Sequence, residues 1–384
     1  MLAIGLMSGT SLDGIDAALV RVLPLGLGYR VELLRFETYP FARDLAGTLR
    51  AALPPNTGSV AAIAHLHHTL GGAFGEAARG IRGDDRIGYV ASHGQTLWHE
   101  GAAHVTLQLG DAFVIREAAG ATVCYDFRSA DCAAGGHGAP LVARVDALLF
   151  GGAGEDRVAL NLGGIANVTL LRRGASPEEA IAFDTGPGGM LIDGFVHERT
   201  AGQRDFDRDG ALSAAGRVDA TLLSRLLAES YFAAPPPKTT GREHFGTHFL
   251  ARYREALAGL SLEDGAATLT ELTAASVAQA IERAGFGGAC VVAAGGGARN
   301  PTLLARIAAR LKGARVEVSD AMGIPAEAKE AIAFAVLGYE TLRERPANVT
   351  AATGARRAVT LGAIAPLRLA ELLAEIAAEI RASQ

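Results

Sequence analysis

The sequence contains few cysteines and no long apolar run. Its 384 residues include only three cysteines, Cys124, Cys132 and Cys290, and none has the CxxC spacing of zinc and redox sites. No apolar stretch reaches the ~18 residues that cross a bilayer. The chain begins MLAIGLMSGTS, without a positively charged leader. We therefore expect a cytoplasmic protein that has no membrane partner.

An excess of positive charge and the common nucleotide motifs are also lacking. The formal net charge is −5, which leaves no basic field for nucleic acid. Neither GxGxxG nor GxxxxGK[ST] occurs, so a dinucleotide fingerprint and a P-loop are excluded. Any bound nucleotide must therefore be held by a different sequence motif.

Glycine and apolar residues, by contrast, are abundant. Glycine accounts for 48 residues and apolar residues for 49% of the chain, which fits tight turns between buried segments. Strand-like runs such as 2–6 and 157–162 alternate with helical patterns such as 59–79 and 326–344. This alternation predicts an α/β fold.

The length of the chain and its high apolar content predict two domains. The boundary falls near 151–156 (GGAGED), giving an N-terminal α/β domain over 1–150 and a C-terminal α/β domain over 151–365, with the C-terminal helix packing back on the first. The Pro-rich stretch inside 205–246 indicates an insertion or surface lobe.

Each predicted domain opens with a Gly-rich turn between two strands. LAIGLMSGTSLDGIDAALVRV starts the first, and RVALNLGGIANVTLLRR starts the second. Similar turns arise by chance, so this similarity between the two halves does not by itself establish an internal duplication. If it is real, two equivalent hairpins face a common cleft.

The first hairpin has the residues of an anion site. Backbone N–H groups at Gly9, Thr10 and Ser11 favour anions. Asp13 in the same turn would repel phosphate unless a hydrated Mg²⁺ lies between them. A plain β-turn explains the same residues.

The second half offers similar turns and one prominent carboxylate. In AFDTGPGGM, Asp184 ends a strand and the following glycines lead into a helix, whose start is another anion site. A carboxylate there suits a general base or a metal ligand, although a capping Asp is the plainer alternative. A third cluster, GGGARNP, suits contact with a base and ribose.

Further polar residues follow predicted strands in the first half of the chain. Others lie near the start of a helix close to the end of the chain. His93 lies in SHGQT and Arg128 in DFRSAD, where α/β sheets bind ligands. Arg128 suits a substrate carboxylate, whereas His93 also suits a hydrogen-bonded turn. Glu327 and Glu330 lie about one turn apart near the start of a helix predicted over 323–342, where they could simply complement the helix dipole.

Taken in order, GLMSGTSLDGID, SHGQT, QLGD, DFRSAD, AAGGHGAPLV, NLGGIANVT, FDTGPG, GGGARNP and KEAIAFA resemble the anhydro-N-acetylmuramic acid kinases from residue 5 to about 364. The resemblance implies the two-domain fold of the sugar kinase, actin and heat-shock-chaperone ATPase superfamily, with ATP in the interdomain cleft.

The resemblance also implies a set of site residues. The implied ATP contacts are Gly9, Thr10, Ser11, Leu12, Asp13, Gly14, Ile15, Asp16, Asn161, Gly163, Gly164, Asn167, Gly295, Gly296, Gly297 and Asn300. The implied sugar contacts are His93, Arg128, Gly186 and Gly188. Asp184 and Glu330 are the implied catalytic carboxylates, and Asp13 is the implied ligand of Mg²⁺ through water.

The family's reaction joins hydrolysis of the 1,6-anhydro bond to phosphorylation of O6, giving N-acetylmuramic acid 6-phosphate and ADP in peptidoglycan recycling. Three departures from its pattern are His137 for Gln, Gly189 for Asn, and IPAEAKEA for DPDWVEA. An ordinary sugar kinase and a non-catalytic ATP-binding protein remain alternatives. The resemblance further suggests a homodimer.

Overall fold

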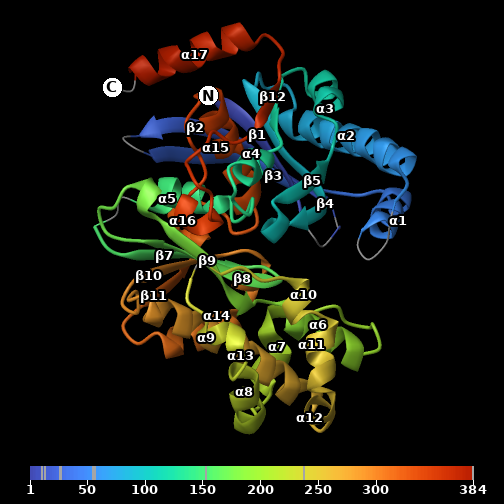
Figure 1. The fold of residues 1–384 in the computed structure, drawn as a ribbon, viewed down its shortest axis with the longest axis vertical. Coiled ribbons are helices and arrows are strands. Elements are labelled where there is room, and N and C mark those ends of the chain that lie inside the picture. Colours follow the sequence, from blue (N-terminus) through green and yellow to red (C-terminus); the bar gives the residue numbers. More distant parts are fainter. Residues whose placement is uncertain are drawn as a thin grey trace. The chain divides into compact units, whose positions relative to one another are not determined.

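The computed structural model describes residues 1–9, 12, 14–25, 28–53, 58–151, 154–236 and 238–382, without the side chains of 242, 243 and 247. The chain divides into two compact units (Figure 1). Unit 1 comprises Met1–Leu149, Ser176–Glu179 and Ala328–Gln384, and unit 2 comprises Phe150–Ala175 and Ala180–Glu327.

Unit 1 is built on a mixed sheet in the order β12-β6-β4-β1-β2-β3, with β5 paired to β4. Its strands are β1 (Leu2–Ser8), β2 (Gly14–Leu25), β3 (Gly28–Pro40), β4 (Tyr89–Glu100), β5 (Val105–Leu109), β6 (Thr122–Tyr125) and β12 (Ala363–Ala365). β1, β2 and β3 pair antiparallel, whereas β4 lies parallel to both β1 and β6.

Unit 1 also contains helices. They are α1 (Arg43–Ala52), α2 (Val60–Arg82), α3 (Ala112–Ala119), α4 (Ser129–Ala133), α5 (Val142–Phe150), α15 (Lys329–Leu342), α16 (Thr350–Thr353) and α17 (Leu369–Ala382). Of these, α1, α2 and α3 contribute to the core of the sheet. Ser59 caps α2 by accepting the Ala62 N–H, and Gly83 ends it with a positive φ. Between these caps, residues such as Leu70 and Phe74 recur on one face and join the sheet core.

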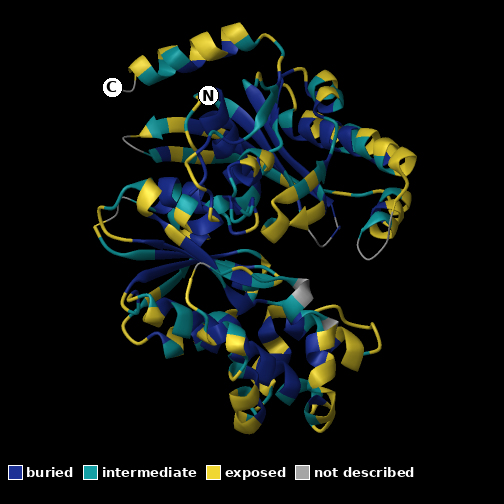
Figure 2. Ribbon diagram, viewed as in Figure 1, coloured by how far each residue is buried: buried dark blue, intermediate teal, exposed yellow. Residues whose placement is uncertain are grey.

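Helix α15 packs so closely against β1 that only glycine fits at residue 5. A Cβ at Gly5 would overlap the carbonyl oxygen of Ala331, and one at Gly338 on α15 would lie 2.7 Å from Ala91 Cβ. Nearly all of α15 is buried, and Figure 2 shows the central strands of unit 1 equally dark. Residues 328–384 therefore belong to unit 1.

Unit 2 has a five-stranded sheet in the order β11-β10-β7-β8-β9. Its strands are β7 (Arg157–Leu162), β8 (Ile165–Leu171), β9 (Ile181–Pro187), β10 (Cys290–Ala294) and β11 (Arg315–Val318). β7, β8 and β9 pair antiparallel, whereas β10 lies parallel to β7 and β11.

The two sheets share one topology. The order β6-β4-β1-β2-β3 in unit 1 repeats as β11-β10-β7-β8-β9 in unit 2, with the same parallel and antiparallel pairs. The hairpins β1–β2 and β7–β8 occupy equivalent places. The expected α/β class and the duplication suggested by the similarity between the two halves are thus confirmed.

The helices of unit 2 form two groups. Those against the sheet are α13 (Leu262–Arg283) and α14 (Pro301–Arg310). The others, together with the start of α13, enclose a separate apolar core. They are α6 (Met190–Arg199), α7 (Ala211–Ala215), α8 (Ala220–Leu227), α9 (Ser230–Ala233), α10 (Arg242–Phe245), α11 (Thr247–Arg252) and α12 (Arg254–Ala258). The segment predicted as an insertion is thus a helical lobe, and it extends past residue 246.

Another sequence expectation differs from the structure. The second domain was expected to reach residue 365, but unit 2 ends at Glu327 because α15 completes the core of unit 1. Among the described residues, no helix combines the length and apolar character needed to cross a membrane.

Candidate functional site

The first hairpin is shaped by close backbone contacts. A Cβ at Gly14 would overlap the carbonyl oxygen of Tyr39, so β2 must begin with glycine. Ser8 Oγ lies 2.8 Å from the Gly14 carbonyl oxygen and 2.7 Å from Gln95 Oε1, which ties the hairpin to β4. Leu12 is buried with a φ of +57°. Of the other predicted ATP contacts here, Gly9 lies just after β1, and Thr10, Ser11 and Asp13 lie outside the described residues.

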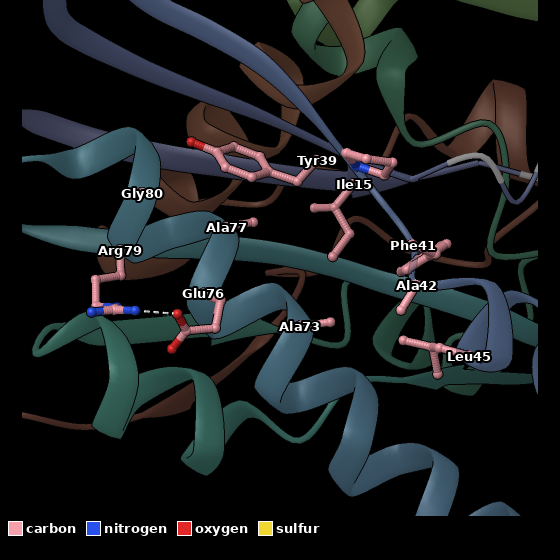
Figure 3. Close-up of a pocket in the computed structure, with 11 residues that line it drawn as sticks. Ile15, Tyr39, Phe41, Ala42, Leu45, Ala73, Glu76, Ala77, Arg79 and Gly80 are labelled. Carbon is pink, nitrogen blue, oxygen red and sulfur yellow. Dashed lines mark hydrogen bonds and ion pairs between the residues drawn. The ribbon is translucent and has the colours of Figure 1, made fainter.

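Ile15 and Asp16 follow on β2 but face different surroundings. Thr38 Oγ1 donates to Asp16 Oδ1 at 2.6 Å. The Ile15 side chain is buried and lines a cavity of about 630 Å³ between β3, α1 and α2 (Figure 3). Ile15 is the only predicted site residue among the residues that line this cavity. Its side chain therefore belongs to the core, and any contact with ATP must come from its backbone.

His93 and Arg128 are in direct contact. Arg128 Nε donates to His93 Nε2 at 3.0 Å, and Arg128 Nη1 donates to the Gly138 carbonyl oxygen at 2.6 Å. His93 Nδ1 lies 2.9 Å from the Gly94 carbonyl oxygen, so its proton is on Nδ1. Burial and the nearby guanidinium lower the pKa of His93 well below its usual value. His93 is therefore a neutral acceptor that fixes the guanidinium plane.

Glu330 lies in the first turn of α15. The charged groups that act on it belong to β2, to the residue before α4, to α5 and to α15 itself. Burial is the main cause that raises the pKa of Glu330, and Asp16 and Asp146 raise it further. Lys329 and Arg128 act in the opposite direction. Glu330 also raises the pKa of Arg128, whose burial lowers it to about 10. The structure thus brings His93, Arg128, Glu330 and Asp16 into one electrostatic group within unit 1.

A residue that sequence reasoning missed, Asp131, organises the loop after α4. It is fully buried, and its Oδ2 accepts the Gly138 N–H at 2.8 Å. Its Oδ1 accepts from Asn348 Nδ2 and from Thr353 Oγ1, both at 2.7 Å. Asp131 thereby holds the Gly138 carbonyl that Arg128 contacts. Asp131 is the second Asp of DFRSAD, a motif in which the sequence alone suggested a role only for Arg128.

In unit 2, the second hairpin rests on the turn after β9. The N–H groups of Gly188 and Gly189 donate to the Gly164 and Gly163 carbonyl oxygens at 2.9 and 2.8 Å. A Cβ at Gly188 would overlap Gly163 O, and Gly186 has a φ of +144°. These glycines are therefore needed for close approach of two backbones, and they place the start of α6 beside the hairpin.

Asn161 and Asn167 face each other across this hairpin, and the third glycine cluster packs against it. A Cβ at Gly295 would lie 2.7 Å from Asn161 Oδ1, and one at Gly297 would lie 2.8 Å from Leu162 Cβ. The predicted ATP contacts Asn161, Gly163, Gly164, Asn167, Gly295 and Gly297 are thus brought together.

Gly296 and Asn300 differ from the rest of their cluster. A Cβ at Gly296 would meet nothing within 4 Å, so its backbone borders open space. Asn300 Oδ1 instead accepts the Leu303 N–H at 2.9 Å and caps α14, which begins with Pro301. The Asn300 oxygen has a structural role that the sequence analysis did not assign.

Asp184 is held on β9 beside Asn167 of the second hairpin. Its backbone N–H donates to the Lys238 carbonyl oxygen at 3.1 Å, and its Oδ2 accepts the Thr240 N–H at 2.9 Å. Tyr231 Oη donates to the Asp184 carbonyl oxygen at 2.8 Å. The carboxylate is therefore held in a fixed orientation by the segment that carries the prolines, a contact the sequence did not reveal.

Asp193, in the first turn of α6, lies near a second carboxylate, that of Asp207. Burial, with the nearby charge of Asp207, raises the pKa of Asp193 on α6 to about 7. A Cβ at Gly189 would lie 3.1 Å from Asp193 Oδ2. A side chain at residue 189 would therefore require the Asp193 carboxylate to shift slightly.

Within the described part of the chain, no three His, Cys, Asp or Glu side chains cluster in a way that could hold a metal ion. The three cysteines are free and buried. The His-rich stretch 65–68 lies on α2, where His67 Nδ1 accepts the Gly110 N–H at 3.1 Å.

Comparison with known proteins identifies relatives over almost the whole chain. A family model described as anhydro-N-acetylmuramic acid kinase matches residues 1–367. The protein of that name from Caldanaerobacter subterraneus subsp. tengcongensis is 42% identical over 382 residues, covering 94% of this chain and 96% of its own. The one from Streptomyces avermitilis is 46% identical over 382 residues, covering 96% and 95%.

Solved structures resemble the chain more distantly. The activator of 2-hydroxyisocaproyl-CoA dehydratase from Clostridium difficile, with bound ADPNP, has a TM-score of 0.43 at 14% identity over 88% of this chain and 95% of its own. The match of the family model and the sequence relatives carry the assignment: the chain belongs to the anhydro-N-acetylmuramic acid kinase family.

Proposed function

We propose that the protein is an ATP-dependent kinase that opens 1,6-anhydro-N-acetylmuramic acid with water and phosphorylates the released O6. The products are N-acetylmuramic acid 6-phosphate and ADP. Family membership supports the substrate, and the observation that carries the chemistry is the orientation of Asp184. Its Oδ2 is fixed by the Thr240 N–H beside the second hairpin.

Asp184 is the general base of the proposed reaction. Its carboxylate takes a proton from a water molecule as the water oxygen bonds to the anomeric carbon. The bond from that carbon to O6 breaks, and its electron pair stays on O6. O6 then bonds to the γ-phosphorus of ATP as the bond to the β,γ-bridging oxygen breaks and ADP leaves.

The two hairpins hold the phosphates of ATP by backbone N–H groups. At Gly14, where β2 begins, and at Gly188, in the turn that rests on the second hairpin, a Cβ would overlap neighbouring backbone, so the close backbone approach at each hairpin requires glycine. Such turns present amides to an anion, and the start of α6 adds the favourable end of its dipole. Gly296 borders open space that suits the adenosine.

Mg²⁺ is part of this proposal, with Asp13 as its ligand through water. One carboxylate and several waters are typical of Mg²⁺ bound with nucleotide phosphates. The ion would neutralise phosphate charge. Removal of Mg²⁺ by EDTA should abolish turnover, and added Mg²⁺ should restore it.

Arg128 and Glu330 contact the sugar in this proposal. Because Nε and Nη1 of Arg128 are engaged by His93 and Gly138, the guanidinium is preorganised and Nη2 meets the sugar carboxylate. Glu330, beside Arg128 in the charge group, faces the sugar and the attacking water.

The decisive experiment measures ADP release from Mg-ATP with and without the anhydro sugar, and weighs the product by mass spectrometry. A product heavier by one phosphate and one water supports the proposal. Phosphate without water would indicate an ordinary sugar kinase, and bound ATP with no ADP release would indicate a non-catalytic ATP-binding protein.

We propose two further properties on the basis of the family resemblance. We propose a homodimer, which sedimentation velocity would test against a monomer. We also propose a cytoplasmic location, where ATP is available, and cell fractionation would test it.

A further inference from the structure

One buried hydroxyl close to Asp184 has no partner. Thr240 Oγ1 is buried, yet no residue in the described part of the chain forms a hydrogen bond with it. His244 Nε2, four residues later, is buried and unsatisfied in the same way. Buried polar atoms almost always have a partner, so an unsatisfied one requires an explanation.

The position of this hydroxyl is tied to the proposed base. The Thr240 N–H donates to Asp184 Oδ2 at 2.9 Å, and the hydroxyl oxygen is only three covalent bonds from that nitrogen. The Lys238 carbonyl accepts the Asp184 N–H at 3.1 Å, so residues 238–240 run beside β9, which is the edge strand of its sheet. The hydroxyl therefore belongs to a residue that directly contacts the Asp184 carboxylate.

The segment is anchored firmly enough to preorganise the hydroxyl. Lys238 Nζ donates to the Tyr231 carbonyl oxygen at 3.0 Å and lies 4.6 Å from the centre of the Tyr231 ring. Tyr231 Oη in turn donates to the Asp184 carbonyl oxygen at 2.8 Å. These contacts close a ring of interactions from Asp184 through the segment and back.

Such a hydroxyl contributes nothing to folding in the free protein. An unsatisfied buried hydroxyl costs free energy, and valine has the same shape without that cost. Its retention beside the base is explained if a ligand supplies the missing hydrogen bond.

We propose that Thr240 Oγ1 is a contact for the reacting sugar, forming a hydrogen bond with a hydroxyl or amide group of the substrate held at Asp184. This inference rests on the proposed function and adds a specificity-determining residue to it. The contact is absent in the free protein and forms only when the sugar binds.

The test compares Thr240→Val with Thr240→Ser and with Thr239→Val. Thr239 is exposed on the same segment, so its substitution is a matched control. We expect Thr240→Val to raise the KM for 1,6-anhydro-N-acetylmuramic acid about 3- to 10-fold, the loss of one neutral hydrogen bond. The KM for ATP should not change, and Thr240→Ser and Thr239→Val should behave like the wild type.

Thermal unfolding without ligand supplies the readout that separates binding from structure. A hydroxyl without a partner predicts that Thr240→Val has the same Tm as the wild type or a higher one. A lower Tm would overturn the proposal by showing that the hydroxyl stabilises the fold.

Failure of this inference and failure of the proposed function give different results. If the wild type releases ADP with the sugar and Thr240→Val has an unchanged sugar KM, only the Thr240 contact is overturned. If the wild type shows no sugar-dependent ADP release, the proposed function falls and the contact falls with it.

Discussion

Arg128 donates from Nε to His93 Nε2 across 3.0 Å, and this contact defines the chemical state of both residues. The imidazole must be neutral to accept, which agrees with a pKa lowered by burial and by the guanidinium. The guanidinium loses one donor but gains a fixed plane. His93 is therefore a positioning residue for Arg128.

Substitution His93→Phe should weaken sugar binding and spare ATP. Phenylalanine can keep the packing on Phe334, whose ring lies 4.7 Å away, but it removes the acceptor. Loss of a hydrogen bond to a charged group predicts a rise in sugar KM of about 10- to 100-fold in initial-rate measurements. His68→Phe, at an exposed position, is the control. An unchanged sugar KM would show that Arg128 needs no help from His93.

Substitution Asp184→Asn should remove catalysis while leaving the nucleotide bound. Asparagine preserves the shape and can still accept the Thr240 N–H, but it cannot take a proton. We expect turnover to fall about 10²- to 10⁴-fold with nearly unchanged ATP affinity by calorimetry. Asp205→Asn, at an exposed side chain, should have no effect. Full activity of Asp184→Asn would exclude Asp184 as the base.

Substitution Lys329→Met should destabilise the protein strongly. Lys329 Nζ and Asp146 Oδ1 lie 2.8 Å apart, and the two side chains are only 3% and 1% exposed. Removing one partner leaves a buried charge, which predicts a loss of about 3–5 kcal/mol in the free energy of unfolding by urea. The double variant Lys329→Met/Asp146→Leu should recover much of that loss. A single variant as stable as the wild type would contradict this account.

Substitution Asp193→Asn should flatten the dependence of stability on pH. The ordinary pKa of Asp193 is 3.8, and the folded protein raises it to about 7, mainly by burial. Between these values the folded chain holds a proton that the unfolded chain has lost, so this group favours folding at low pH. Its contribution is lost as the pH rises through 7.

Tm measured from pH 5 to pH 8 tests this expectation. The wild type should lose more stability across the range than Asp193→Asn does. Parallel curves for the two proteins would show that Asp193 titrates normally.

The sequence predicted the elements whose signals are local. Gly163, Gly188 and Asp184 lie at strand ends marked by glycine, and the structure places them together in unit 2. The pairing of His93 with Arg128 also joins the two predicted polar stretches on neighbouring strands, although His93 lies within β4 and does not follow a strand as expected. Their functional roles stay predictions.

The remaining features depend on contacts between distant residues. Nothing near Gly5 indicates that Ala331 will pack on it, so the place of α15 in unit 1 was not predicted, although the C-terminal helix was expected to pack back on the first domain. The Thr240 contact with Asp184 joins an irregular segment to a strand edge, and irregular segments have no periodicity from which pairing could be inferred. Three further predicted ATP contacts, Thr10, Ser11 and Asp13, lie outside the described residues.

The return of residue 328 to unit 1 also affects the order in which the protein can fold during synthesis. Apart from residues 176–179, unit 2 is a continuous stretch inserted into unit 1. As the chain leaves the ribosome, unit 2 is fully synthesised at Glu327, before α15 exists to cover the Gly5 face of β1. The half of the protein that is made first is therefore the last to complete its core.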